Sequence, residues 1–181
     1  MIFHETTLQD AVLIELEPRG DERGMFARAF DAAEFAARGM ASVYPQTNMS
    51  ATRTAGTVRG LHYQRGEHVE AKLVRCTRGA IMDTIVDLRR DSPTYLKWQA
   101  FELTAENRRQ LYVPPGFGHG FQSLVDDVEI VYPVSASYAP AAEGGLRFDD
   151  PAVAIDWPLP VSTLSEKDAS WAPLDPASPP F

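Results

Sequence analysis

Histidines are the side chains of this sequence best suited to proton transfer or metal binding, and there are four of them. His62 stands in the segment RGLHYQ (59–64), and an imidazole that titrates near neutral pH suits a general base. Two histidines that share a metal on one strand are usually separated by one residue, so that both point to the same face. The next histidine, His68, is about 20 Å further along a straight strand. The spacing favours a metal-free site, and a three-ligand site of His62, His68 and His119 stays open as an alternative.

The charges set a second limit on function. The net charge is −8, which argues against nonspecific binding of nucleic acid. Of the 17 basic residues 14 are arginine, and all of these except Arg147 come before position 110. Because the guanidinium fork binds phosphate in a bidentate manner, an anionic ligand could find local partners despite the acidic total.

The length of 181 residues fits one domain with a substantial core. No apolar run approaches the roughly 20 residues that span a bilayer, and the first ten residues, MIFHETTLQD, show no secretory signal. The single cysteine, Cys76, suits a reducing compartment and is interpreted as a small buried hydrophobe. We therefore expect a cytoplasmic protein without a membrane partner.

Most of the chain is expected to form strands. The segment 31–39 predicts one short helix, with Asp31 as its N-cap and Gly39 at its end. The apolar runs 71–76 and 80–88, separated by Arg78 and Gly79, predict a hairpin. Further strands are predicted over 98–103, 109–113, 119–124 and 128–134. Short strands at this spacing indicate an antiparallel sandwich or barrel, followed from about 158 by a proline-rich irregular tail.

The RGLHYQ segment closely resembles a motif of the dTDP-4-dehydrorhamnose 3,5-epimerases. Five further segments resemble that family in the same order: GDERGMF (20–26), 71–95, 103–121, 149–158 and LSEKD (164–168). The resemblance covers nearly the whole chain. It implies an all-β, cupin-type jelly roll over residues 1–181, whose tail (158–181) packs on the barrel. It also implies a homodimer that exchanges N-terminal strands and uses neither a metal nor an organic cofactor.

The resemblance also implies a set of catalytic residues. His62 would be the base that removes a proton beside the C4 ketone of a nucleotide-linked sugar, and Asp168 would orient it. Lys72 would stabilise the enolate oxygen. Tyr132 would return a proton from the other side of the sugar.

Residues for binding the nucleotide and the sugar follow from the same resemblance. Arg23 and Arg59 would approach the diphosphate, Phe26 would lie near the base, and His119 would support the cavity. The remaining polar contacts to the substrate would be Gln46, Asn48, Tyr138, Glu143 and Lys167.

Two departures from the family pattern bear on specificity. Arg28 stands where dTDP-specific members usually have a glutamate for the thymine base. Since a guanidinium only donates hydrogen bonds, it suits the N3 acceptor of cytosine, and we expect a CDP-sugar rather than a TDP-sugar. Pro133 and Ser137 replace a lysine and a tyrosine after Tyr132, which leaves open whether C3, C5 or both are inverted. Pro133 also predicts an edge strand or a bulge.

Three alternatives remain beside the epimerase. One is a cupin 3,4-ketoisomerase. Another is a metallocupin oxygenase, because Pro114, Gly116 and His119 match the form of a metallocupin motif. The third is a cupin that binds a sugar nucleotide without turning it over.

Overall fold

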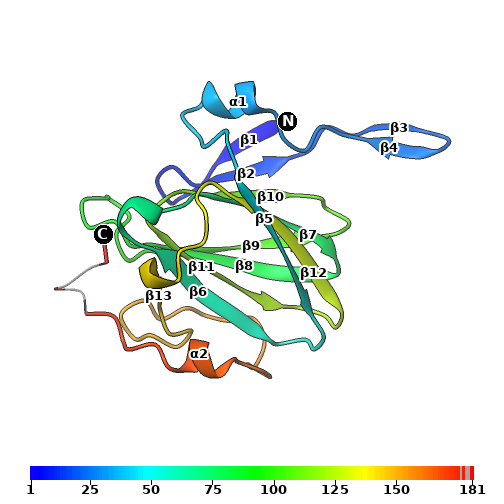
Figure 1. Cartoon of the computed structure of the whole chain (residues 1–181). Helices are drawn as coiled ribbons and strands as arrows, with labels where there is room; N and C mark the ends of the chain where they lie inside the picture. The colour runs from blue at the N-terminus through cyan, green and yellow to red at the C-terminus, as the bar shows by residue number, and fades with distance from the viewer. Residues whose placement is uncertain (176, 178–179) are drawn as a thin grey trace.

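Two antiparallel sheets enclose the main core of the protein in the computed structural model, which describes residues 1–175, 177 and 180–181 (Figure 1). The six-stranded sheet has the order β1 (Ile2–Glu5), β2 (Val12–Glu15), β10 (Gln110–Val113), β7 (Lys72–Arg78), β12 (Val128–Val134), β5 (Gln46–Thr52). The five-stranded sheet has the order β13 (Glu143–Gly145), β6 (Val58–Gln64), β11 (Phe117–Ser123), β8 (Ala80–Asp87), β9 (Trp98–Thr104). This is the expected all-β jelly roll of the cupin type.

The helices are short and peripheral. They are α1 (Ala32–Ala36), α2 (Glu166–Ala169) and two 3-10 turns, Gly66–His68 and Pro140–Ala142. Asp31 caps α1 as predicted, because its carboxylate accepts hydrogen bonds from the backbone N–H groups of Ala33 and Glu34. The helix is shorter than the predicted 31–39, and a turn carries the chain from Ala37 to Gly39. No helix among the described residues is long and apolar enough to cross a membrane.

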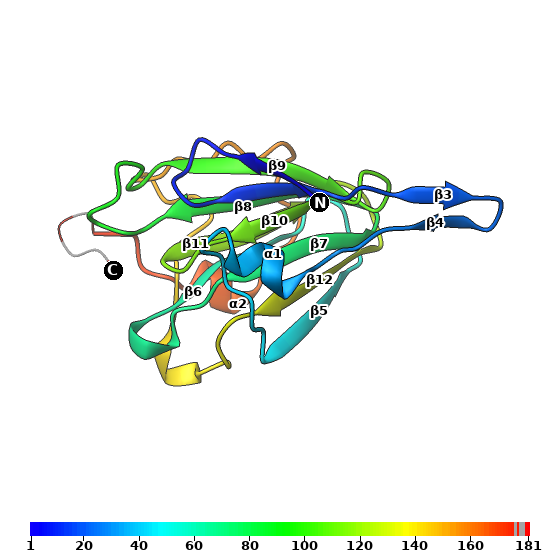
Figure 2. The ribbon, with the colours of Figure 1, turned by 90° about the horizontal axis from the view of Figure 1, so that it is seen from above.

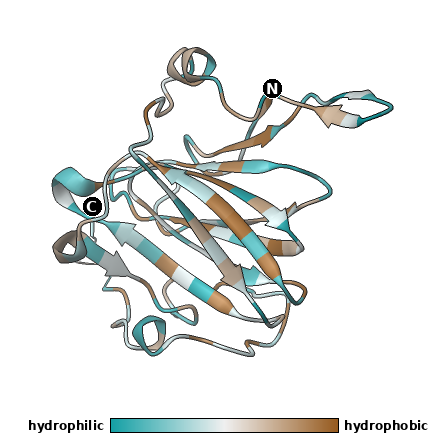
Figure 3. Cartoon of the chain, turned by 45° about the vertical axis from the view of Figure 1, so that its right-hand side comes forward, coloured by the Kyte–Doolittle hydropathy of each residue, from teal (hydrophilic) through white to brown (hydrophobic). Residues whose placement is uncertain are grey.

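Side chains from both sheets build the main core. Val74, Ile85, Leu103, Leu111 and Ile130 come from five different strands and are almost fully buried in one cluster. Hydrophobic and hydrophilic bands alternate along several strands of the sandwich (Figure 3), as expected for strands with one face in a core. Burial of this apolar surface is the main source of stability for the fold. Cys76 lies in the same cluster, and burial raises the pKa of its thiol to about 11.

Strands β7 and β8 do not form the hairpin that the sequence predicts. β7 lies between β10 and β12 in the six-stranded sheet, whereas β8 lies between β11 and β9 in the other sheet. Gly79, with φ of 73°, turns the chain from one sheet to the other. Both strands are apolar because each is buried in the interior of its own sheet, and this pattern says nothing about which strand is the neighbour.

The prediction for Pro133 was also wrong. β12 pairs with both β5 and β7, so Pro133 lies in an interior strand rather than at an edge. The register irregularity of β12 falls between Glu129 and Ile130. The ladder with β7 pairs Val131 and Val134 but, within the described part of the chain, not Pro133, which has no N–H to donate.

A narrow hairpin of β3 (Arg19–Asp21) and β4 (Gly24–Phe26) projects away from the sandwich (Figures 1 and 2). All six of its strand residues are exposed. A hairpin this short, without a face packed on a core, is marginal on its own.

The C-terminal segment packs along the five-stranded sheet. Gln122 on β11 exchanges two hydrogen bonds with the backbone of Leu159, and the N–H of Val58 donates to the carbonyl of Thr163. These contacts carry the chain to α2 beside β6. Of the proline-rich tail, residues 176, 178 and 179 lie outside the described residues.

Candidate active site

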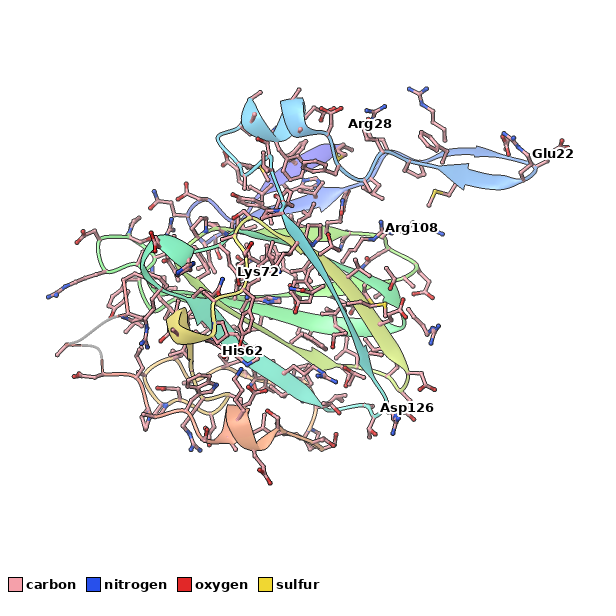
Figure 4. The ribbon with its side chains drawn as sticks, in the orientation of Figure 1. Glu22, Arg28, His62, Lys72, Arg108 and Asp126 are labelled. Carbon is pink, nitrogen blue, oxygen red and sulfur yellow. The ribbon has the colours of Figure 1, made fainter. Side chains whose placement is uncertain are left out.

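A cavity of about 480 Å³ opens between the two sheets. β6 contributes Arg59 and His62, β7 contributes Lys72, β11 contributes His119, and β12 contributes Tyr132. The segment around α2 completes the wall with Thr163, Leu164, Ser165, Lys167 and Asp168. Figure 4 shows His62 and Lys72 in the middle of the molecule. The structure thus gathers all four predicted catalytic residues around one cavity.

His62 and Asp168 form a close polar contact between two residues that line the cavity. His62 Nε2 lies 2.6 Å from Asp168 Oδ1, although the two residues are 106 positions apart in sequence. The side chain of His62 is 34% exposed while that of Asp168 is 5% exposed, so the imidazole is open to the cavity while the carboxylate that contacts it is buried. Among the described residues Nδ1 of His62 has no hydrogen-bond partner, which leaves this nitrogen for a substrate proton.

The helix α2 fixes the position of Asp168. Its N-cap is Ser165, whose hydroxyl accepts a hydrogen bond from the backbone N–H of Asp168 at 3.0 Å. The N–H of Gly60 donates to the second carboxylate oxygen at 3.3 Å. Burial by itself would raise the pKa of Asp168, but the hydrogen bonds from His62 and Gly60 hold it below its usual value. The carboxylate therefore stays charged beside the imidazole.

Glycine at position 60 is required by the packing around the base. A Cβ on Gly60 would lie 2.6 Å from the Cα of Gly120 on β11, and its φ is 118°. A Cβ on Gly120 would in turn lie 2.6 Å from the carbonyl oxygen of Arg59. The two backbones approach closely directly beside His62, which explains both glycines.

Lys72 is a buried cation on the opposite sheet. Its ammonium group donates to the carbonyl of His62 at 3.3 Å and lies 3.4 Å from Glu70 Oε1. Burial lowers the pKa of Lys72, and the negative charge of Glu70 is the largest influence that opposes this. The side chain of Lys72 is 8% exposed, and a buried charge acts more strongly on its neighbours than one in water.

Tyr132 lies on β12 in the same sheet as Lys72, while His62 lies on β6 in the facing sheet. Burial raises the pKa of the Tyr132 phenol, and the charge of Glu70 raises it further. A hydrogen bond with Asn48, its register partner on β5, acts in the opposite direction. The phenol is therefore held in its protonated form, on the other wall of the cavity from the imidazole.

A second histidine–aspartate pair lies beside the first. His119 and His62 are register partners on β11 and β6, and His119 Nε2 lies 2.8 Å from Asp83 Oδ1. Asp83 Oδ2 is buried and has no hydrogen-bond partner among the described residues. His119 is placed in the cavity wall, as the sequence predicts.

Several predicted polar residues form a bonded chain, called the rim here, that reaches the cavity wall at Lys167. Glu143 accepts a hydrogen bond from the Tyr138 hydroxyl at 3.1 Å and forms an ion pair with Lys167. Gln46 Oε1 accepts from the backbone N–H of Tyr138 at 2.6 Å. Arg59 donates to the Thr52 hydroxyl and the Ala51 carbonyl. The rim therefore joins β5, β13 and α2, and only Arg59 and Lys167 of these predicted residues line the cavity itself.

Three predicted nucleotide contacts do not reach this cavity in their own chain. Arg23 and Phe26 lie on the projecting hairpin, where Arg23 pairs with Asp21 and the ring of Phe26 is exposed. Arg28 follows the hairpin and donates to Asp31 at 3.0 Å. Figure 4 shows Arg28 well away from His62. The sequence resemblance placed these residues with the others because it carries no information about distances between residues.

The sequence analysis missed two acidic residues of the site. Asp83 is a carboxylate inside the apolar run 80–88, and that contrast is a signal of a buried functional group. Glu70 precedes Lys72 by two positions, a spacing that puts both side chains on one face of an extended segment.

The metal alternative gains no support from the arrangement of the histidines. His62 and His119 each direct Nε2 to a carboxylate, and His68 ends the 3-10 turn Gly66–His68 beside Glu67. No group of three histidine, cysteine or acidic side chains among the described residues is arranged to hold a metal ion.

A cupin-type sandwich that gathers a histidine–carboxylate pair, a buried cation and a phenol around one cavity defines an acid–base enzyme. The family model described as dTDP-4-dehydrorhamnose 3,5-epimerase matches residues 5–176. The chain belongs to this family, and it is an isomerase of the epimerase class.

Individual relatives of this chain are also named as epimerases. The dTDP-4-dehydrorhamnose 3,5-epimerase of Methanothermobacter thermautotrophicus is 43% identical over 175 residues, covering 95% of this chain and 94% of its own length. The dTDP-4-dehydrorhamnose 3-epimerase of Streptomyces niveus is 40% identical, over 84% of this chain and 73% of its own length. The crystal structure of the 3,5-epimerase from Bacillus anthracis, with TDP and PPi bound, is 39% identical with a TM-score of 0.92. It covers 96% of this chain and 99% of that one.

Proposed function

We propose that this enzyme epimerises a nucleotide-diphospho-4-dehydro-6-deoxyhexose next to its C4 ketone, in deoxysugar precursor biosynthesis. The whole chain, 1–181, acts as one epimerase domain. The observation that carries the proposal is the His62–Asp168 pair, which presents a carboxylate-anchored imidazole to a cavity whose facing wall holds a half-buried phenol.

His62 is the base in the first step. Its Nδ1 takes the proton from the carbon beside the ketone, and the electrons of the broken C–H bond move into the enolate. The imidazolium that forms carries positive charge toward the Asp168 carboxylate, 2.6 Å from Nε2, and this contact stabilises it.

Lys72 stabilises the enolate oxygen. Fixed positive charge that is already in place where negative charge develops requires no reorganisation during the reaction. The burial of Lys72 strengthens this effect because the surroundings screen its charge less than water does.

Tyr132 completes the inversion. Its phenol gives a proton to the carbon from the β12 wall, opposite the β6 wall from which His62 took one. The two positions on facing sheets support a change of configuration rather than a return of the same proton.

The proposal includes inversion at C3, at C5 or at both carbons. The names of the relatives include both a 3,5-epimerase and a 3-epimerase at about 40% identity. Pro133 and Ser137 follow Tyr132 in the segment that leads from the cavity wall to the rim. The shape of this segment would decide whether the enzyme inverts C3 or C5.

The nucleotide is a second open choice. The names of the relatives specify dTDP, whereas Arg28 favours a base with an acceptor at N3, as in CDP. One of the Arg28 donors is already used by Asp31. Calorimetric titration with TDP, CDP and GDP tests this: we expect CDP to bind most tightly, and tightest binding of TDP would reject the CDP hypothesis.

We further propose a homodimer in the cytoplasm. Met25 and Phe26 expose large apolar side chains on a hairpin that projects from the sandwich, and such surface is typical of an interface. Arg23, Phe26 and Arg28 could then serve the cavity of a second copy. The cytoplasmic location is supported by the single free, buried Cys76.

Deuterium exchange tests the chemistry directly. The enzyme is incubated in D2O with TDP- and CDP-4-keto-6-deoxyglucose, and loss of C3–H and C5–H is followed by NMR. We expect exchange at C3, C5 or both, and we expect it to vanish in His62→Asn. The matched control is His68→Asn, a nearby histidine outside the cavity wall, which should retain wild-type exchange.

The alternatives predict different outcomes in the same samples. A 3,4-ketoisomerase would move the ketone to C3, which changes the carbon spectrum. A noncatalytic binding cupin would bind the nucleotide without any exchange. No exchange at either carbon with either nucleotide would defeat the epimerase proposal.

A further inference from the structure

Glu70 is a mostly buried carboxylate that stands just before β7 and contacts Lys72. Its Oε1 lies 3.4 Å from Lys72 Nζ, and the two side chains are 11% and 8% exposed. Glu70 does not line the cavity, so it has no direct path to a substrate. Its charge nevertheless acts on the contents of the cavity through its neighbours.

Gln64, at the end of β6, holds this carboxylate in place. Gln64 is 4% exposed, and its Nε2 donates to Glu70 Oε2 at 3.0 Å. The same amide donates to the carbonyls of His68 and Ser137, and its oxygen accepts from the N–H of Ala139 at 2.6 Å. A side chain anchored at four points can fix the position of Glu70 relative to both sheets.

The charge of Glu70 favours the protonated forms of two catalytic groups. For Lys72, burial lowers the pKa, while Glu70, followed by Asp83 and Glu143, raises it. For Tyr132, burial and then Glu70 raise the pKa, while Asn48 and the charge of Arg59 lower it. Of the charged groups that face Lys72 in the described part of the chain, Glu70 is the one in ion-pair contact with it.

We propose that Glu70 is a positioning residue that keeps Lys72 a cation. Its role rests on the proposed epimerase function, because the cation stabilises the enolate. One carboxylate outside the cavity thereby prepares the cation on β7 for the reaction, while the imidazole on the facing wall is prepared by a different carboxylate, Asp168.

The direction of the effect of Glu70→Gln follows from the charges. Without the negative charge, the ammonium form of Lys72 is less favoured, so its pKa falls. Lys72 then loses its proton at lower pH than in the wild type. The alkaline limb of the pH–rate profile should move to lower pH, with a loss of rate that grows as the pH rises.

Lysine NMR measures this without any substrate. The chain has three lysines, Lys72, Lys97 and Lys167, so ¹³Cε-labelled lysine gives three signals, which single Lys→Arg variants assign. We expect the titration midpoint of Lys72 to fall in E70Q and that of Lys97 to stay unchanged. The matched control is Glu67→Gln, which removes the same charge from an exposed side chain of the preceding 3-10 turn and should leave Lys72 unmoved.

Glu70→Asp provides a graded comparison and a second variant if E70Q does not fold. It keeps the charge but shortens the side chain by one methylene, which moves the carboxylate away from Lys72. The titration midpoint of Lys72 in this variant should therefore lie between those in the wild type and in E70Q. An unmoved Lys72 midpoint in the variants would overturn the inference. So would an E70Q rate that is reduced by the same factor at every pH, because a merely structural role predicts that result.

The two proposals fail in different ways. Absence of deuterium exchange by the wild-type enzyme would reject the epimerase function and leave the lysine titration informative about Glu70. Normal exchange by the wild type with an unchanged Lys72 titration in E70Q would reject only the role of Glu70.

Discussion

At the scale of single residues, two histidine–aspartate pairs on neighbouring strands illustrate how exposure assigns roles. His62 and His119 are opposite one another on β6 and β11, and each contacts a buried carboxylate through Nε2. The side chain of His62 is 34% exposed, whereas that of His119 is 6% exposed. A base must reach the substrate, so the geometry favours His62 as the group that moves the proton and His119 as part of the wall.

Tyr132→Phe should separate proton abstraction from inversion. The variant keeps the imidazole and the cation, so His62 can still remove the substrate proton and return deuterium from solvent to the same face. We expect exchange of C–H for deuterium to continue while formation of the epimer falls by about 10²-fold or more. NMR of the sugar in D2O measures both quantities in one sample.

Tyr44→Phe is the matched control for that experiment. Tyr44 packs beside Phe30 at the periphery, and its hydroxyl is buried without a partner among the described residues. Its loss should change neither exchange nor inversion. Full inversion by Tyr132→Phe would show that another group delivers the second proton.

At the scale of elements, local patterns predicted the strands of the second half of the chain well but their partners poorly. β12 was predicted with its observed bounds, because apolar residues and flanking turn residues mark it. No strand was predicted for β1, β2, β5 or β6, and the three-residue strands β3, β4 and β13 were missed because such short strands carry no periodic apolar pattern. The wrong hairpin of β7 and β8 has a related cause, because strand pairing in a jelly roll is largely nonlocal.

The candidate site shows the same limit. His62 and Asp168 are 106 residues apart, and nothing in the local sequence of either joins them. Resemblance to a family supplied that pair, and the geometry now gives it a distance. Glu70 belongs to no motif that the resemblance used, so only its contact with Lys72 drew attention to it.

Asp87, at the end of β8, anchors the loop that leads to β9. Its fully buried carboxylate accepts hydrogen bonds from Arg89, Ser92 and Thr94. Asp87→Asn removes the charge that Arg89 and the hydroxyl groups are arranged to meet. We expect the free energy of unfolding at pH 7 to fall by about 3 kcal/mol, as for other broken buried ion pairs. Urea denaturation measures it.

The pH dependence of that effect has a definite sign. Burial alone would raise the pKa of Asp87, but the hydrogen bonds from Arg89, Ser92 and Thr94 hold it below the usual value. A carboxylate with a depressed pKa contributes stability that is fully present above the unfolded pKa, about 4, and lost as the pH falls through the folded one. The difference between wild type and Asp87→Asn should therefore shrink below about pH 4. The exposed Asp91→Asn should show neither effect, and a difference independent of pH would contradict this account.

At the scale of the whole molecule, the projecting hairpin of β3 and β4 is an element that contributes no residue to the cavity of its own chain. The sandwich completes the histidine–carboxylate pair, the cation and the phenol by itself, but Arg23 and Phe26 remain exposed and do not line the cavity. Figure 1 shows their hairpin, β3–β4, projecting away from the sandwich. A second copy that receives the hairpin would bury its apolar side chains and complete the nucleotide contacts in one step.

Subunit complementation tests that arrangement more sharply than a molecular mass alone. His62→Asn and the double variant Arg23→Ala/Phe26→Ala should each have little activity, for different reasons. In a mixed dimer, one site combines the intact His62 of one subunit with the intact hairpin of the other. Random mixing in equal amounts should therefore restore about a quarter of the wild-type sites. Size-exclusion chromatography with light scattering establishes whether the mixture is dimeric. If a dimer forms and exchanges subunits but no activity returns, the hairpin serves its own chain or no site at all, and the shared nucleotide site is wrong even though the dimer is right.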